Sequence, residues 1–174
     1  MKSTVHYREV QRFTQPWLWV FILATLLFVL VTFGWALYQQ LVLGEPWGNR
    51  PMSNTGLVLS SCGAIGVSAA IVLLFVVLRL EVEVRDDGVH VAFRPLSRRV
   101  FSFSDIRQCT ARKFQPLRNY GGWGLRSNFR SNAYTVRGDS GVWFEFHSQK
   151  PVLVGSQRAE ELADVVNAVM ASRT

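Results

Sequence analysis

Two long segments without a charged residue occupy most of the first half of this sequence. Lys, Arg, Asp and Glu are absent from residues 13–44 and again from residues 51–78. As an α-helix, the apolar run over residues 17–38 would rise roughly 33 Å, enough for a hydrocarbon core of about 30 Å. We therefore expect transmembrane helices over residues 16–38 and 56–79, which excludes a wholly cytosolic enzyme.

Aromatic residues frame the first apolar run, with Trp17 and Trp19 at its start and Trp35 and Tyr38 at its end. Such rings settle at the two headgroup levels of a bilayer. A cleaved signal peptide is the alternative, but its apolar region is usually about 7 to 15 residues long and ends at a small-residue cleavage site. The pattern favours a span.

The short segment between the two spans predicts a helical hairpin. Residues 1–15 form an expected N-terminal tail and residues 39–55 an expected external linker with several Gly and Pro residues. Basic residues favour the cytoplasmic side of a span. They are concentrated before the first span (Lys2, Arg8, Arg12) and after the second (Arg79, Arg85, Arg94, Arg98), whereas the linker has only Arg50. We expect a multi-pass inner (plasma) membrane protein with both termini in the cytoplasm.

Small residues recur every four positions in the second span, at Cys62, Gly66 and Ala70. This spacing places them on one helix face, where they allow another helix backbone to approach closely. The face is expected to pack against the first helix of the same chain. Alternatively, it contacts another subunit of a homo-oligomer or a membrane protein partner.

Residues 80–174 are expected to form a separate cytoplasmic domain. Apolar residues alternate with polar ones in residues 80–84 and 89–93, around the turn signal Asp86-Asp87-Gly88, which predicts a β-hairpin. Further strands are expected over residues 99–103, 106–112, 133–136, 142–146 and 152–154, and a helix that Ser156 can cap follows them. About seven strands and one helix predict an α+β membrane protein whose antiparallel sheet or incomplete barrel is covered by the terminal helix.

Several stretches of this domain resemble a known architecture. They are LEVEVRDDGVHV from Leu80, the Ser104-Asp105-Ile106 step, YGGWG over residues 120–124, and the closing VLVGSQRAEELADVV. Together they are similar to uncharacterised prokaryotic two-helix membrane proteins with a C-terminal pleckstrin-homology-like (PH-like) domain. The resemblance implies a seven-stranded PH-like barrel capped by a helix, and such domains often mediate assembly. It implies little about activity.

Catalytic and metal-binding patterns are weak. The histidines His6, His90 and His147 are scattered, with no metal-ligand spacing around them. Cys109 lies on a predicted strand and is expected to be a core residue, and no disulfide with Cys62 is expected. Gly121, Gly122 and Gly124 lack the Lys-Ser or Lys-Thr of a phosphate loop, so we interpret them as giving backbone freedom around Trp123. We expect no enzyme activity, cofactor or metal.

Positive charge is concentrated in residues 94–137, which hold ten basic residues and a single acidic one, Asp105. This segment is compatible with a solvated surface, an anionic-lipid surface, a protein-docking surface or, less well, nucleic-acid binding. The aromatic, Gly-rich segment 114–132 is the best candidate for a working loop. The predicted binding residues are Arg98, Arg99, Arg112, Lys113, Arg118, Arg126 and Arg130, with Tyr120 and Trp123 as anchors.

These observations predict a non-enzymatic membrane protein. Its cytoplasmic PH-like module would contact anionic lipid headgroups or a protein partner and support homo-oligomeric assembly. The alternative is an accessory subunit of a larger membrane enzyme or transporter, in which the small-residue face and the aromatic loop are buried against that partner.

Overall fold

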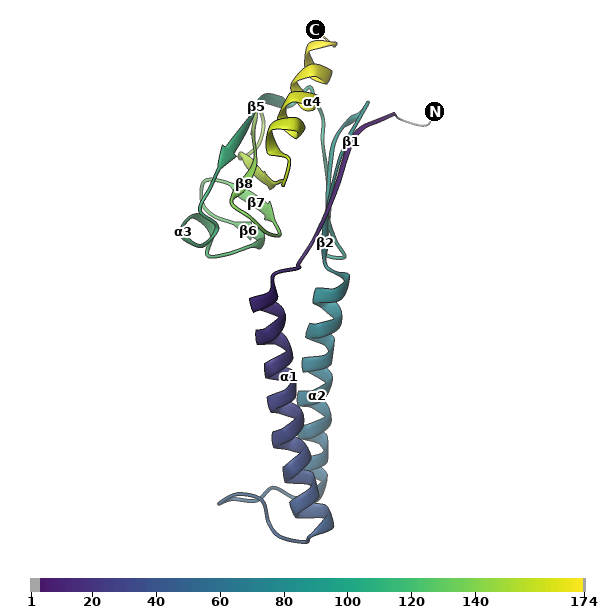
Figure 1. Cartoon of the computed structure of the whole chain (residues 1–174), viewed down its shortest axis with the longest axis vertical. Coiled ribbons are helices and arrows are strands. Elements are labelled where there is room, and N and C mark those ends of the chain that lie inside the picture. The colour runs from purple at the N-terminus through teal and green to yellow at the C-terminus, as the bar shows by residue number, and fades with distance from the viewer. Residues whose placement is uncertain (1–3, 174) are drawn as a thin grey trace. The chain divides into compact units, whose positions relative to one another are not determined.

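The computed structural model describes residues 4–173, which divide into two compact units. One unit is the helical segment 14–76, and the other combines the residues up to Phe13 with residues 77–174. Figure 1 shows the first unit as two long helices and the second as strands with the C-terminal helix. The two units are described separately below.

The helical unit contains two helices that are long and apolar enough to cross a membrane, as predicted. Helix α1 spans Pro16–Leu37 and continues as one π-helical turn, η1, over Tyr38–Val42, and helix α2 spans Asn54–Val77. Pro16 suits the first turn of α1 because that turn leaves its N–H groups without intrahelical acceptors. Most side chains of both helices are exposed, so the unit offers its apolar surface to the surroundings.

A narrow seam of less exposed residues runs along both helices, which lie side by side (Figure 1). On α1 the fully buried residues are Ile22 and Ala36, and on α2 they are Leu57 and Ser61. Ser61 donates its hydroxyl hydrogen to the carbonyl of Leu57 at 2.7 Å, which satisfies a polar group at this depth. The connection between the helices is tied by Gln40, whose Nε2 donates to Met52 O and Asn54 Oδ1, each at 2.8 Å.

The β unit contains two sheets, with the strand orders β1-β2-β3-β4 and β5-β8-β9-β7-β6. Helix α4 (Ala159–Ala171) follows the last strand, and a short helix, α3 (Pro116–Tyr120), precedes β6. The strands are β1 (Val5–Arg12), β2 (Arg79–Arg85), β3 (Gly88–Arg94), β4 (Ser97–Phe101), β5 (Ile106–Lys113), β6 (Gly124–Ser127), β7 (Asn132–Thr135), β8 (Ser140–Phe146) and β9 (Val152–Gly155).

All seven predicted strands and the terminal helix are confirmed, with boundaries within a few residues of those expected. The hairpin at Asp86-Asp87-Gly88 is present, and Gly88 has a φ of 155° and lies against the carbonyl group of Phe101. A side chain there would collide with that backbone. Three elements of the β unit were not predicted: β1, β6 and α3.

The N-terminal segment expected as a tail contributes a strand to the β unit. β1 pairs antiparallel with β2, and Arg12 lies opposite Arg79 in this register. β1 ends four residues before α1 begins, and β2 begins two residues after α2 ends. The pairing therefore joins the chain segments that enter and leave the helical hairpin.

The described residues form two sheets, and no closed barrel is found among them. The sheets are not purely antiparallel, because β7 and β9 pair in parallel. The inner face of β2 and β3 is apolar, and Phe101 on β4 lies 5.0 Å from Phe146 on β8 between ring centroids. The two sheets thus share one core.

Helix α4 covers part of this core. Its buried residues Leu162, Ala163 and Val166 recur at helical spacing, and the helix packs against β5 and β8 and contacts β1. Glu160 and Glu161 lie in its first turn, where negative charge is favoured by the helix dipole. The predicted amphipathic cover is confirmed.

Candidate functional site

The predicted basic residues lie on both sheets. Arg98 and Arg99 are on β4, Arg112 and Lys113 are at the end of β5, Arg118 is on α3, Arg126 is on β6, and Arg130 lies between β6 and β7. All of these side chains belong to exposed residues. Arg98 and Arg99 point to opposite faces of β4, because neighbouring residues of a strand alternate. The nine predicted site residues therefore do not form one constellation.

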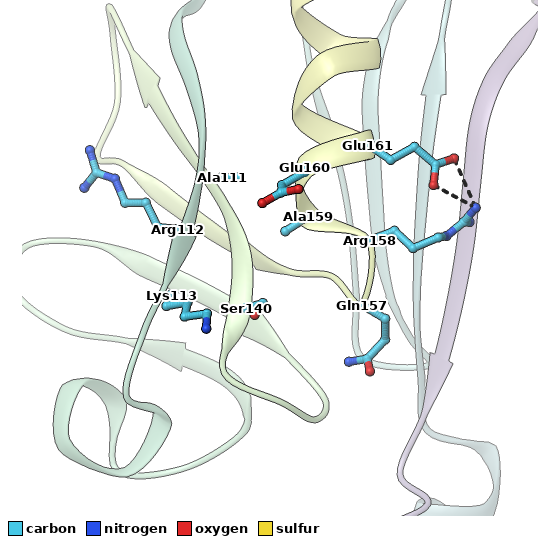
Figure 2. A pocket seen from close by; sticks show the side chains of 9 residues that line it. All are labelled: Ala111, Arg112, Lys113, Ser140, Gln157, Arg158, Ala159, Glu160 and Glu161. Atoms are coloured by element: carbon cyan, nitrogen blue, oxygen red, sulfur yellow. Dashed lines mark hydrogen bonds and ion pairs between the residues drawn. The ribbon is translucent and has the colours of Figure 1, made fainter.

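One groove of about 450 Å³ lies between β5, β8 and the start of α4. Figure 2 shows that Arg112 points away from α4, whereas Glu160 directs its carboxylate toward β5. Arg158 is turned to the other side, where its Nη1 is 3.1 Å from Glu161 Oε1. The basic residues of this groove thus do not converge on a common point.

The guanidinium of Arg112 is already engaged. Its Cζ lies 5.0 Å from the centroid of the Trp143 ring, and its Nη2 is 3.7 Å from Glu145 Oε1. A second groove, of about 500 Å³, brings Lys113 and Arg118 together beside Asn119 and Asp139. Of the predicted set, Lys113 thus lines both grooves, together with Arg112 in the first and Arg118 in the second.

Tyr120 and Trp123, predicted as anchors, make contacts inside the β unit. The Tyr120 ring packs edge-on against buried Phe114 at 6.5 Å, and its hydroxyl is 2.8 Å from Ser131 Oγ. Trp123 donates its indole N–H to the carbonyl of Gly138 at 2.9 Å. Both side chains are only partly exposed. Their contacts stabilise segment 114–132, and the two side chains do not project from it.

Segment 114–132 contains the helix α3 and the strand β6, so it is not a long open loop. Gly121 ends α3 in a left-handed conformation with a φ of 68°, and its N–H donates to the carbonyl of Leu117. Gly122 and Gly124 also have positive φ, which agrees with the predicted backbone freedom around Trp123. The apolar side chains that do project are Leu117, which is 69% exposed, Leu125, which is 42% exposed, and Phe129, which is fully exposed.

The densest charge cluster lies on the outer face of the first sheet. Because side chains alternate, this face is opposite the one that carries the buried apolar residues of β2 and β3. We call it the arginine face. It contains the basic residues Arg8, Arg12, Arg79, Arg85, Arg94 and Arg98 and the acidic residues Glu81 and Glu83.

Two glutamates organise the arginine face. Glu81 lies 2.8 Å from Arg79 Nε and 2.8 Å from Arg94 Nε, and Glu83 lies 3.2 Å from Arg8 Nε and accepts a hydrogen bond of 2.8 Å from Arg85 Nε. The glutamate side chains are only 10% and 14% exposed, respectively. Each carboxylate is therefore shared by two arginines, which leaves the face strongly positive.

Arginines occupy one rung across three neighbouring strands of this sheet. Arg12 on β1 pairs with Arg79 on β2, and Arg79 pairs with Arg94 on β3. Like charges directly opposite each other destabilise a sheet. This rung lies at the end of the sheet where the chain continues into both long helices. Charge repulsion is thus concentrated in residues that are close in sequence to the predicted membrane spans.

Sequence reasoning missed the contribution of β1 to this face. The usual alternation of apolar and polar residues is hidden there, because the inward positions are Tyr7, Glu9 and Gln11. The β-forming residues Val5 and Tyr7 in a segment with outward arginines were the available signal. Without β1, the arginines of β2 and β3 looked like an ordinary half-solvated strand face.

The inward polar residues of β1 are held by the start of α4. Glu9 accepts hydrogen bonds from Tyr7 Oη at 2.7 Å, Ser156 Oγ at 2.6 Å and the Gln157 backbone N–H at 2.8 Å. Burial, together with the neighbouring Glu9, raises the pKa of Tyr7 to about 12, although the Ser156 hydrogen bond opposes the shift. Glu9 therefore fixes β1 to the rest of the β unit.

The small-residue face of α2 does not pack against α1. Cys62, Gly66 and Ala70 are all exposed, and no atom lies within 4 Å of a Cβ built on Gly66. The residues buried on α2 are Leu57 and Ser61, on a different side of the helix. The expected internal packing of this face is wrong, because the seam between the helices uses other residues. Contact with another subunit stays a prediction.

Two histidines contact neighbouring aspartates. His6 Nε2 is 2.8 Å from Asp86, and His90 Nε2 is 3.0 Å from Asp87. Hydrogen bonds from the Thr4 backbone and His6 lower the pKa of Asp86, and the His90 hydrogen bond lowers that of Asp87. Within residues 4–173, no group of three or more His, Cys, Asp or Glu side chains could hold a metal ion.

A comparison of the chain with protein-family models found no match, and a comparison with curated proteins found none either.

Proposed function

We propose that this chain is a non-enzymatic integral membrane protein whose β unit contacts anionic lipid headgroups. In this proposal, α1 and α2 cross the inner membrane as a hairpin and both termini lie in the cytoplasm. The β unit is a PH-like module, and copies of the chain assemble through the exposed small-residue face of α2. Two sheets with a covering C-terminal helix support the PH-like assignment.

The arginine face is the observation that carries this proposal. Six arginines surround two glutamates on one face, and the sheet concerned is continuous in sequence with both candidate membrane helices. Each Lys or Arg near an anionic leaflet contributes on the order of 1 kcal/mol within a Debye length of about 8 Å. The residues predicted from the sequence on the second sheet, such as Lys113 and Arg118, would add to this attraction.

Pairing between β1 and β2 supports the two-crossing topology. The strand before α1 and the strand after α2 are neighbours in one sheet, so both helix ends connect to the same folded unit. A folded sheet cannot lie on both sides of a bilayer. The number of crossings is then even, and a reporter fused after Thr174 would be found in the cytosol.

Lipid enrichment around the full-length chain tests the proposal. A fragment that starts at Leu80 would lack β1, so the whole protein is reconstituted in mixed phosphatidylcholine and phosphatidylglycerol bilayers. The protein is then extracted in polymer-bounded nanodiscs, and the lipid ratio is measured by mass spectrometry. We expect phosphatidylglycerol to be enriched over the bulk membrane at low salt and less so at high salt.

Two triple variants with equal loss of charge separate the surfaces. Arg85, Arg94 and Arg98 are replaced by Gln in one variant, and Arg112, Lys113 and Arg118 in the other. The first is expected to lose most of the enrichment and the second to lose less. A wild-type protein with no preference for phosphatidylglycerol at any salt concentration would contradict the proposed function.

Exposed apolar residues beside the basic ones favour a second candidate function, that of an accessory subunit in a larger membrane enzyme or transporter. Leu117 and Phe129 project from segment 114–132, and interfaces between proteins are enriched in such aromatic residues and arginine. In this case, a partner protein would co-purify in gentle detergent at fixed stoichiometry. Replacing Phe129 by Ser would release that partner without changing the lipid enrichment.

A further inference from the structure

A cavity of about 500 Å³ lies at the end of the arginine face where β2 follows α2 in the chain. Three arginines and several apolar residues line it together. We call it the arginine cavity, and its principal lining residues are Val77, Arg79, Arg94, Pro95, Leu96 and Arg98. A neighbouring cavity of about 340 Å³ shares Arg79, Arg94 and Arg98 with it.

Positive charge in and beside this cavity exceeds what the protein itself neutralises. Glu81 is the carboxylate shared by Arg79 and Arg94. Among residues 4–173, no hydrogen bond or ion pair is found for the side chain of Arg98 or of Arg12, the first member of the arginine rung. The Nε of Arg79 is buried and donates no hydrogen bond within the described part of the chain, although it lies close to Glu81. The described residues thus carry a net positive charge at this cluster.

Phosphate is the anion that guanidinium groups bind best. The planar guanidinium presents paired N–H donors that match two phosphate oxygens, and it is weakly hydrated, so little solvation is lost on binding. Arg79, Arg94 and Arg98 approach one cavity from three adjacent strands, which provides donors from more than one direction. A single negative charge held there would also relieve the repulsion along the arginine rung.

The apolar lining indicates that the phosphate belongs to an amphiphile. Val77, Pro95 and Leu96 line the same cavity, and Leu96 is 58% exposed. A free phosphate ion would gain nothing from these side chains, whereas the glycerol and upper acyl chain of a phospholipid would cover them. Arg79 is two residues beyond the end of α2, so chain geometry allows at most about 7 Å between their Cα atoms. That reach corresponds to the headgroup layer.

We propose that the arginine cavity binds the phosphate group of an anionic phospholipid, with Arg94 and Arg98 as the principal donors. The proposal rests on the proposed function, because it requires α2 to cross the bilayer, and it narrows that function to one site. The bound lipid would act as a fixed counter-ion between the sheet and the membrane. It would occupy the site singly, in contrast to the diffuse enrichment around the rest of the basic surface.

Arg98 and Arg99 provide a matched pair of variants for the test. They are neighbours on β4, both are exposed, and they lie on opposite faces, so Arg98→Gln and Arg99→Gln remove the same charge at nearly the same place. The full-length protein in a neutral detergent is titrated separately with dioctanoyl phosphatidylglycerol, dioctanoyl phosphatidylcholine and inorganic phosphate. Native mass spectrometry counts the bound molecules. Thermal unfolding and Arg98→Lys, which retains the charge, control for misfolding.

The expected result is one tightly bound phosphatidylglycerol per wild-type chain, with weaker binding of the other two probes. Arg98→Gln should lower this affinity about five-fold, the effect of one arginine near an anionic headgroup, and Arg99→Gln should leave it within two-fold. Arg98→Lys should retain part of the affinity. Combining Arg94→Gln with Arg98→Gln should abolish the single-site binding.

Two outcomes would overturn the assignment. Equal effects of Arg98→Gln and Arg99→Gln would mean that the cavity is not a distinct site, while the lipid enrichment of the wild type would still uphold the proposed function. Inorganic phosphate that binds as tightly as phosphatidylglycerol would identify a soluble phosphate site and reject the lipid. If the wild type shows no bilayer enrichment either, the proposed function fails together with the site.

Discussion

Glu9 on β1 and Ser156 at the start of the α4 segment are 147 residues apart in sequence, yet the Ser156 hydroxyl donates to Glu9 Oε2 at 2.6 Å. The same carboxylate also accepts from Tyr7 and from the Gln157 backbone. Its residue is only 7% exposed. This contact links the strand before the helical hairpin to the last helix of the chain and makes the β unit depend on both ends of the sequence.

Replacing Glu9 by Ala should therefore destabilise the β unit strongly. The substitution leaves the hydroxyls of Tyr7 and Ser156 buried without their acceptor, at a cost of about 2–4 kcal/mol in the free energy of unfolding. Chemical denaturation of the full chain in detergent, followed by near-UV circular dichroism, measures this loss. Val10→Ala on the exposed face of the same strand is the control and should cost less than about 1 kcal/mol. Equal losses would contradict the role of Glu9.

The hydrogen bonds of Glu9 also explain why β1 could not be predicted from the sequence. Strands β2 and β3 were predictable because their inward positions, such as Leu80, Val82 and Val91, are apolar and fully buried. The inward positions of β1 are polar, since they meet the start of α4 and not the apolar core. No local pattern reveals a partner that lies more than a hundred residues away.

The candidate site, like β1, also depends on contacts between segments that are distant in sequence. Arg98 was identified from the excess of positive charge in residues 94–137. Arg94 was counted in that segment but not chosen as a binding residue, and Arg79 was noticed only as a marker of membrane orientation. Strand register brings Arg12, Arg79 and Arg94 to one rung, and register depends on the full set of pairings. The excess of basic residues predicted a basic surface, whereas the grouping of these arginines could be recognised only from the strand pairing in the sheet.

Cys109 should react slowly with alkylating reagents in the folded protein. Burial in the first place, and the charge of Asp164 in the second, raise the pKa of its thiol from 9.0 to about 12. At pH 8 the thiolate would be a fraction on the order of 10⁻⁴ of the total. A Cys62→Ser variant leaves Cys109 as the single thiol, and iodoacetamide labelling is then followed by mass spectrometry. Labelling should become fast only after denaturation, and equally fast labelling of the native protein would contradict the buried position.

Asp105 should make the stability of the β8–β9 loop decrease at acid pH. Its Oδ1 accepts from the backbone N–H of Ser148 at 3.1 Å and from Ser148 Oγ at 2.7 Å, and its Oδ2 accepts from Gln149 Nε2 at 3.1 Å. These hydrogen bonds, the Ser148 hydroxyl first, lower the pKa of Asp105 below its usual 3.8. A lowered pKa means that the folded state favours the ionised form. The stabilisation is thus complete above the unfolded pKa and is lost as pH falls through the lower folded value.

Hydrogen exchange measures this effect at the Ser148 amide. After correction for the intrinsic rate, protection should be constant from pH 7 to about pH 5 and should decrease below about pH 4. Asp105→Asn should reduce protection at every pH and remove the acid step. Amides of α4 serve as the internal reference, because a decrease of protection shared by α4 would indicate global unfolding instead.

Gly66→Leu should reduce the size of the assembly without disturbing the single chain. Gly66 lies on the exposed small-residue face of α2, and nothing lies within 4 Å of a Cβ at this position, so the helical unit has room for the new side chain. A leucine there would hold an approaching helix away from the backbone surface that small residues provide. Mass photometry of the protein in gentle detergent reports the change. Gly34→Leu is the matched control, because Gly34 is equally open but lies on α1 instead of the small-residue face of α2. An assembly of unchanged size in the Gly66 variant would remove this face from the interface, and the search for the contact would move to the exposed apolar residues of α1.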